Sequence, residues 1–332
     1  MQIKQAILQS EKQAVIEFLD KFDLKYNKFV DYTAYVEQGK EIIATVSLSK
    51  NLICDLAVSN NFQGENLATL LITHAVSKLR EDEIYGYKVF TKPIYLEKFL
   101  DLGFRVLVKG DNFVALEGGE SNVYSTLKGL KTKITMDFGG FDGDYGAIVM
   151  NANPFTLGHL ALLEHALTKH QKVIVFVVQE DLSKFSFKER FALTYLATNQ
   201  YRGRVCVLPS TDYVVSSSTF PDYFLRSKKD VSKAHAEYDA LLFENYFMKE
   251  LKISKRYLGA EEKEYMCVYN DTLKKVLGDK VEVVDRFCEN GEIISASTVR
   301  ELVKAQKLDE ALKFIPKSCE AVFKMIIGGK KW

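Results

Sequence analysis

The sequence predicts an α/β protein of two domains, an α+β domain followed by a domain with a parallel sheet. The chain has 332 residues, more than one domain usually contains, and 47% of them are apolar, enough for two packed cores. In the first 117 residues, strand-like segments are joined by a tight turn. From Gly146 onward, apolar strands alternate with helices, which is typical of a parallel sheet covered on both faces. We expect domains at 1–117 and 144–332, joined by a connecting segment at 118–143.

Charge balance and hydropathy exclude several classes of protein. Lys and Arg number 45 against 44 Asp and Glu, which argues against bulk electrostatic binding to nucleic acid or anionic membranes. The apolar run at 173–178 is far shorter than the roughly 20 residues of a membrane span. The first residues lack a signal-peptide core, and the five cysteines form no CxxC pair. We therefore expect a reduced, cytoplasmic protein without a cysteine-based metal site.

The first domain begins with an amphipathic segment, in which Val15, Phe18 and Leu19 share one helical face. Two strands then flank a Gln38-Gly39 turn, as in a hairpin. The expected elements are, in order, a helix at 1–22, strands at 33–37, 41–47 and 51–58, a helix opening at 63–68, a short helix at 95–104 and a strand at 113–116.

This order resembles the GNAT acetyltransferase fold. In that family a strand ending in Ala-Val precedes a glycine-containing turn, whose amides and helix N-terminus hold the pyrophosphate of coenzyme A. Ala57-Val58, Gln63-Gly64 and the Leu102-Gly103-Phe104 element carry the resemblance. Asn66 stands at the central glycine position, where Asn tolerates a positive φ but its side chain would crowd a phosphate. Two interpretations stay open, a coenzyme A site and a degenerate domain that binds a partner or simply packs.

The second domain follows a glycine-rich entry at 139–144, after a polar, Lys-rich helix candidate at 122–133. Functional sites in parallel sheets lie at the carboxyl ends of the strands. The strand candidates are 146–150, 172–178, 204–208, 254–258 and 281–286, with helices at 158–169, 187–200 and 270–277.

The most informative segment is the turn from the first of these strands, Asn151-Ala-Asn-Pro-Phe-Thr-Leu-Gly-His159. A strand-to-helix turn offers free backbone N–H groups and the positive end of a helix dipole, which suits a nucleotide phosphate. The turn resembles that of the nucleotidylyltransferase superfamily, whose hallmark is His-x-Gly-His, and Thr156 stands in the first His position. Thr156 can still donate through its hydroxyl but carries no positive charge.

The resemblance implies that His159 donates a hydrogen bond to the α-phosphate of ATP as negative charge develops there. It also implies ATP contacts from the rest of the turn. His74, His165, His170 and His235 have no such context and are interpreted as core or surface residues. The implied ATP-binding residues of the turn are Asn151, Asn153, Phe155, Gly158 and His159.

A second phosphate motif follows the fifth strand, Ile294-Ser-Ala-Ser-Thr-Val-Arg300. Ser295 or Ser297 can cap the next helix, and with Arg300 one turn in they form a phosphate clamp. The motif resembles the Ile-Ser-Ser-Thr-x-x-Arg element of nucleotidylyltransferases, and this resemblance implies that Ser295, Ser297, Thr298 and Arg300 bind the β- and γ-phosphates of ATP. Gly259 and Glu261, after the fourth strand, are also expected to face ATP.

Two further blocks have open interpretations. Lys184 and Arg190 follow the second strand and could face the triphosphate, with Lys184, in the loop, the better catalytic candidate. For Arg190 a solvated helix face is equally compatible. Residues 212–226, rich in hydroxyls and aromatics, could line an acceptor site, dock a partner or pack on the sheet edge.

Blocks along nearly the whole chain together resemble the citrate lyase ligase family, which also has Thr at the position of Thr156. They are the 146–159 block, Glu180-Asp-x-Ser-x-Phe-x-Phe187, Ser217-x-Thr-Phe-Pro-x-Tyr-Phe-Leu225, Arg256-Tyr-x-Gly259, Tyr269-Asn270 and Ile294-Ser-Ala-Ser297.

That resemblance implies a two-step ligase. Acetate attacks the α-phosphate of ATP with the help of Mg²⁺, and the acetyl-adenylate is passed to the thiol of a phosphopantetheine-type group on the acyl carrier subunit of citrate lyase. The alternatives are an adenylyltransferase for a phosphorylated acceptor, a GNAT-type acetyltransferase and a non-catalytic binding protein.

Overall fold

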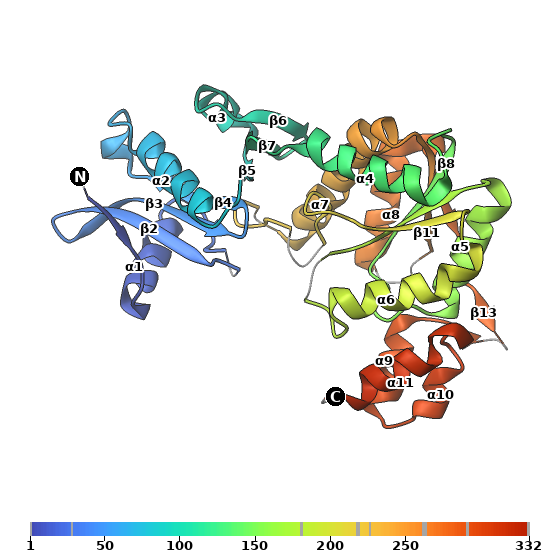
Figure 1. Cartoon of the computed structure of the whole chain (residues 1–332). Coiled ribbons are helices and arrows are strands. Elements are labelled where there is room, and N and C mark those ends of the chain that lie inside the picture. The colour runs from blue at the N-terminus through green and yellow to red at the C-terminus, as the bar shows by residue number, and fades with distance from the viewer. Residues whose placement is uncertain are drawn as a thin grey trace. The chain divides into compact units, whose positions relative to one another are not determined.

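We describe a computed structural model of the chain, in which residues 2–27, 29–179, 182–216, 220–225, 227–260, 264–289 and 292–330 are described (Figure 1). The chain divides into two compact units. One is Met1–Asn122 with Thr219–Ala234, and the other is Val123–Ser218 with His235–Trp332.

The first unit is built on a mixed seven-stranded sheet with the order β1-β2-β3-β4-β5-β7-β6. The β4–β5 pair is parallel and the other neighbouring pairs are antiparallel. Its strands are β1 (Ile3–Gln5), β2 (Tyr32–Gln38), β3 (Glu41–Ser49), β4 (Leu52–Val58), β5 (Gly86–Thr91), β6 (Arg105–Lys109) and β7 (Val114–Gly119), and its helices are α1 (Gln9–Asp20), α2 (Leu67–Glu81) and α3 (Leu96–Asp101).

Helices α1 and α2 cover opposite faces of this sheet. Tyr35 packs in a cluster with Val15, Phe18 and Leu19 of α1, whereas its neighbours Ala34 and Val36 pack in the cluster of α2. Successive strand residues point to opposite faces, which explains the division. This GNAT-like arrangement agrees with the fold expected from the sequence, although β5 and β6 were not among the expected strands and β1 lies in the segment expected to be helical.

The segment after residue 219 contributes to the first unit. Phe220 packs edge-on against Phe90 and Phe113, at centroid distances of 5.6 and 6.2 Å, and the Tyr223 hydroxyl donates to the Phe90 carbonyl at 2.6 Å. The aromatic side chains of the 212–226 block, as far as the structure describes them, are thus buried by packing. The sequence placed this block wholly within 144–332, because nothing local reveals that the chain returns to the first sheet.

The second unit is built on a five-stranded parallel sheet with the order β10-β9-β8-β11-β12. Its strands are β8 (Tyr145–Met150), β9 (Val173–Val177), β10 (Val205–Pro209), β11 (Ile253–Gly259) and β12 (Val281–Val284), and a small hairpin, β13 (Cys288–Glu289) with β14 (Glu292–Ile293), follows. Its helical segments are α4 (Val123–Phe138), α5 (Leu157–Lys169), α6 (Phe187–Thr198), α7 (Lys228–Leu242), which begins in the first unit, a π-helical turn at Phe243–Met248, α8 (Glu264–Leu277), α9 (Ala296–Lys304), α10 (Leu308–Leu312) and α11 (Glu320–Gly328).

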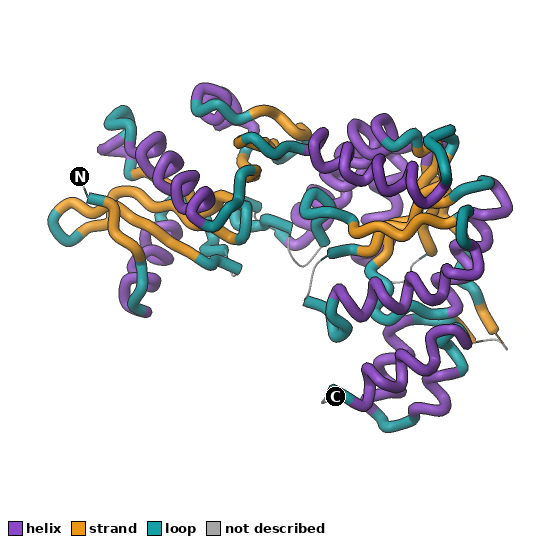
Figure 2. Tube along the Cα trace, viewed as in Figure 1, coloured by secondary structure: helices purple, strands orange, loops and turns teal. Residues whose placement is uncertain are grey.

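Helices cover both faces of this sheet, with α4 on one side and α6 on the other (Figures 1 and 2). The chain runs from β8 toward β9 on one side and from β11 toward β12 on the other, so the strand order reverses between β8 and β11. In such Rossmann-like sheets, ligands bind in the crevice outside the carboxyl ends of the strands at this reversal. The turn after Met150 begins there.

Helix α4 is the clearest difference in the second unit. Residues 118–143 were expected to connect the domains, yet α4 buries Val123, Leu127, Leu130, Ile134 and Phe138. Phe138 packs on Tyr145 of β8, with a centroid distance of 5.2 Å. The lysines between these positions made the segment look polar, but the apolar residues share one helical stripe.

Within the described residues, the helices are too short or too polar for a membrane-crossing role.

Candidate ATP site at the carboxyl end of β8

Buried residues of the turn after β8 anchor it to the core of the second unit. Ala152 adopts a left-handed conformation with a φ of 49°, and Phe155 is fully buried in the core of the second unit. Phe155 therefore anchors the turn and does not face an open site, unlike the ATP contact expected from the sequence. Helix α5 then begins, and the Leu157 N–H donates to the Phe314 carbonyl at 2.9 Å.

His159, in the first turn of α5, is oriented by Thr156. The Nδ1 atom lies 3.1 Å from the Thr156 backbone N and 2.8 Å from its hydroxyl. A backbone N–H can only donate, so Nδ1 accepts and the ring proton is on Nε2. Burial lowers the pKa of His159 to about 4, which keeps the ring neutral at pH 7. His159 as a whole residue is half-buried, and its neutral ring carries the donor proton on Nε2.

Thr156 itself is 1% exposed, and its hydroxyl is directed at His159. The structure therefore gives it a positioning role. Its hydroxyl is not presented as a second open donor, the role the sequence suggested.

Asn153 joins three segments at this edge of the sheet. Its side-chain Oδ1 accepts from the Phe185 N–H at 3.1 Å, and its carbonyl accepts from the Arg300 guanidinium. Asn151 exchanges hydrogen bonds with Ser183, with Nδ2 to Oγ at 3.1 Å. The turn is thereby tied to the loop before α6 and to α9.

Arg190 is the residue at this site that sequence reasoning placed wrongly. It is fully buried, so it neither faces the triphosphate nor belongs to a solvated helix face. Its guanidinium donates to the carbonyls of Val178 at 2.7 Å, Asn151 at 2.9 Å and Phe185 at 3.0 Å. Arg190 shares the buried face of α6 with Leu193, Thr194 and Ala197. This helical spacing of Arg190 with buried residues could have indicated that Arg190 is buried, but its charge favoured the interpretation as a solvated residue.

The second phosphate motif lies beside the first. Ser295 is the N-cap of α9, with its Oγ accepting from the Thr298 N–H at 3.1 Å. The Arg300 guanidinium contacts the Ser297 hydroxyl at 3.2 Å in addition to the Asn153 carbonyl. A Cβ on Gly158 would lie 3.0 Å from the Ile294 carbonyl oxygen, so glycine there permits the close approach. The N-termini of α5 and α9 thus form one region of backbone donors and positive dipole ends.

Lys184 and Gly259 were also predicted to belong to the site. Lys184 is exposed in the loop before α6, and its carbonyl accepts from the Lys330 ammonium at 2.8 Å. Gly259 ends β11, where a Cβ would meet open space, and its carbonyl accepts from the Asn270 side chain at 3.2 Å. Glu261 lies outside the described residues.

Arg256 and Tyr269, which the family blocks include, lie below this edge in a buried cluster. The Arg256 guanidinium is 2.7 Å from the Asp239 carboxylate and 3.1 Å from the Tyr269 hydroxyl. Since Asn270, next to Tyr269, holds the carbonyl of Gly259, the cluster supports the end of β11.

Comparison with known proteins agrees with this geometry. Residues 145–323 match the family model described as the citrate lyase ligase C-terminal domain. The chain belongs to the citrate lyase ligase family. Family members are enzymes of the ligase class, and two curated relatives align almost end to end. The [citrate [pro-3S]-lyase] ligase of Haemophilus influenzae is 29% identical, over 95% of this chain and 96% of that one, and that of Klebsiella pneumoniae is 30% identical, over 92% and 90%.

Among solved structures, the GNAT domain of S. lividans PAT aligns with 36% of this chain and 89% of its own, at 18% identity and a TM-score of 0.30. The sheet order of the first unit and the helices on both faces of that sheet are GNAT-like in themselves.

Proposed function

We propose that the chain activates citrate lyase by acetylating the thiol of the phosphopantetheine-type group on its acyl carrier subunit. Acetate and ATP give acetyl-adenylate and diphosphate, and the thiol then takes the acetyl group and releases AMP. The observation that carries the proposal is the neutral Nε2–H donor of His159, at the point where the N-termini of α5 and α9 meet.

In the first step, a carboxylate oxygen of acetate bonds to the α-phosphorus and the bond to diphosphate breaks. In this proposal His159 and the Gly158 N–H donate to the α-phosphate, where negative charge grows in the transition state. Ser295, Ser297, Thr298 and Arg300 are suited to the β- and γ-phosphates, since a capped helix start and a guanidinium favour anions. Thr156 keeps the His159 ring in the donating tautomer.

Two charged side chains are given different roles. Lys184 is exposed beside the turn, where an ammonium can reach the leaving diphosphate. Arg190 does not contact ATP in this proposal. Its guanidinium holds the carbonyls of Asn151, in the turn, and of Val178 and Phe185, at the two ends of the loop before α6.

Mg²⁺ is expected to accompany ATP, and in that state it neutralises phosphate charge. In the described part of the chain, no three His, Cys, Asp or Glu side chains converge as for a metal ion.

In the second step, the thiolate of the partner attacks the acetyl carbonyl, the bond to the phosphate oxygen breaks and AMP leaves. A nucleophile from this chain is not required. Cys54, Cys206 and Cys319 are buried, and burial raises the pKa of each thiol, so they are poor nucleophiles.

The first experiment is exchange of labelled diphosphate into ATP, with acetate, with longer acids and without acid. Exchange that requires acetate is the expected result, because formation of acetyl-adenylate is reversible. Exchange that needs a phosphorylated acceptor, and no exchange with any acid even when the carrier subunit is present, would each contradict the proposal.

A further inference from the structure

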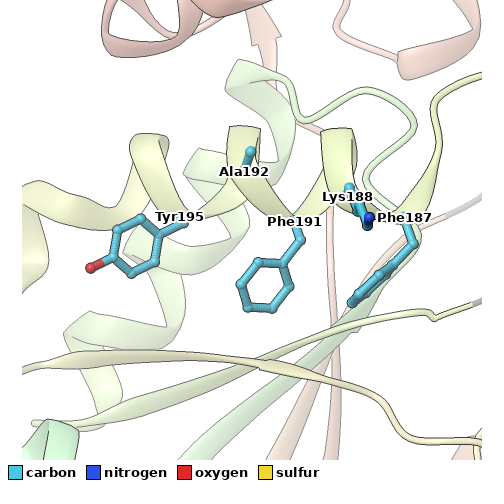
Figure 3. A pocket seen from close by; sticks show the side chains of 5 residues that line it. All are labelled: Phe187, Lys188, Phe191, Ala192 and Tyr195. Atoms are coloured by element: carbon cyan, nitrogen blue, oxygen red, sulfur yellow. The ribbon is translucent and has the colours of Figure 1, made fainter.

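Helix α6 carries an aromatic face that is partly exposed, since Phe187 and Phe191 are half-buried against the core of the second unit and Tyr195 is exposed. Phe187, Phe191 and Tyr195 are four residues apart and project from the same side of the helix (Figure 3). The rings of Phe187 and Phe191 are 5.5 Å apart, and Tyr195 is 58% exposed. With Lys188 and Ala192 these residues line a shallow groove of about 400 Å³, which we call the α6 groove. Contiguous apolar surface of this kind is a common feature of ligand-binding grooves.

The α6 groove begins at the ATP site. Phe187 directly follows the loop in which Ser183 contacts Asn151 and Phe185 contacts Asn153. Leu182, in the same loop, is 54% exposed. From Phe187 to Tyr195 the helix rises by about 12 Å, so the groove leads away from the site along α6. One end of the groove therefore lies next to the loop that contacts the turn after β8.

Positive charge accompanies the aromatic side chains. Lys188 is exposed and lines the groove, and the Lys133 ammonium of α4 lies 5.8 Å from the centre of the Phe191 ring. The neighbouring Glu189 is engaged by Lys330 and does not cancel these charges. The surface therefore suits a slender, partly apolar chain that carries a phosphate.

We propose that the α6 groove binds the phosphopantetheine-type arm of the carrier subunit and guides its thiol to the acetyl-adenylate. This inference rests on the proposed function and deepens it. The methyl and methylene groups of such an arm would pack on Phe187, Phe191 and Tyr195, and the positive charges of Lys188 and Lys133 would attract its phosphodiester, which lies at the end away from the thiol. The arm is a chain of amide-linked segments long enough to follow the helix to the site.

Two variants test the proposal, Ala192→Trp, which fills the groove, and Lys188→Glu, which reverses its charge. Both positions are exposed on α6, so the fold should tolerate them. Matched controls are Ala321→Trp and Lys324→Glu, at exposed positions of α11. Acetyl transfer to the carrier subunit bearing its prosthetic group should fall at least tenfold in both groove variants. Acetate-dependent diphosphate exchange should stay within twofold of the wild type, and the controls should change neither activity.

Transfer within twofold of the wild type in both groove variants would overturn the inference. So would a lower unfolding temperature of Lys188→Glu with transfer unchanged, which would mean that the chain itself or a second copy covers this face. Loss of exchange together with transfer would place the defect at the ATP site and would also overturn it. Absence of exchange in the wild type is a different result, since it would contradict the proposed function and this inference with it.

Discussion

Each unit has a strand-to-helix turn that suits a phosphate, between β4 and α2 and between β8 and α5, and the two turns are built differently. The turn between β4 and α2 ends in exposed residues, 63–66, and Asn66 adopts a φ of 56° without a side-chain hydrogen bond that caps α2. The turn between β8 and α5 is fastened by Asn153, Arg190 and Arg300, and it orients His159. Both offer the positive end of a helix dipole.

This difference shows what a helix N-terminus lacks when it stands alone. Backbone donors attract an anion, but they do not hold a reacting phosphorus in one position. The second turn adds buried hydrogen bonds that fix its shape and a neutral donor in a defined tautomer. We therefore propose that adenylate formation takes place at the turn between β8 and α5.

The change with the largest expected effect is His159→Ala. Removal of one preorganised donor to a developing negative charge typically lowers the rate by about 10²–10³-fold. Acetate-dependent exchange should fall by that factor, while circular dichroism and the unfolding temperature show an intact fold. A decrease of less than threefold in the rate of exchange would mean that His159 does not take part in the reaction.

The same ring predicts a pH dependence of stability. Burial lowers the pKa of His159 to about 4 in the folded chain, against about 6.5 when unfolded. Between these values the unfolded chain binds a proton that the folded chain does not, so stability should decrease as the pH falls. From pH 7 to pH 5 this amounts to about 2 kcal/mol. Denaturant titrations at both pH values should show that decrease in the wild type and a smaller one in His159→Ala. Equal decreases would mean that His159 is not held neutral by the fold.

A smaller effect is expected from Arg300→Ala. Loss of a guanidinium at the β- and γ-phosphates should raise the apparent KM for ATP by about tenfold, with a lesser change in kcat. Arg300→Lys should recover part of the affinity, since it keeps the charge but loses the planar fork. Initial rates of exchange at varied ATP measure both constants. An unchanged KM would refute the clamp.

The smallest effect should come from Asn66→Gly, which restores the usual residue of the GNAT turn. Glycine adopts the observed φ without strain, so the free energy of unfolding should change by no more than about 1 kcal/mol. Exchange should stay within twofold of the wild type. A large change in exchange would mean that the first turn takes part in adenylate formation.

The turns could be located from the sequence because their signals are local. An apolar strand, a turn and a helix start are contiguous in the chain, and the predicted α5 and α6 start within one residue of the observed helices. The β5 strand was not predicted, since Gly86 and the buried Lys88 interrupt its apolar pattern.

The residues that hold the turn and its surroundings in place were harder to predict, because their roles depend on tertiary contacts. Arg190 is a charged residue whose partners are backbone carbonyls, and no sequence pattern distinguishes it from a solvated arginine. The role of Thr156 likewise depends on where the His159 ring lies. Phe220 and Tyr223 pack on a sheet formed far earlier in the chain.

The central claim is that a carboxylate oxygen of acetate attacks the α-phosphorus of ATP at the turn between β8 and α5. The most direct measurement uses acetate labelled with ¹⁸O in both oxygens, together with ATP and the carrier subunit bearing its thiol group, and follows the label by mass spectrometry. The account predicts one ¹⁸O atom in each AMP, because the attacking oxygen leaves with the phosphate when the thiol takes the acetyl group. AMP without label, or label in orthophosphate, would contradict it.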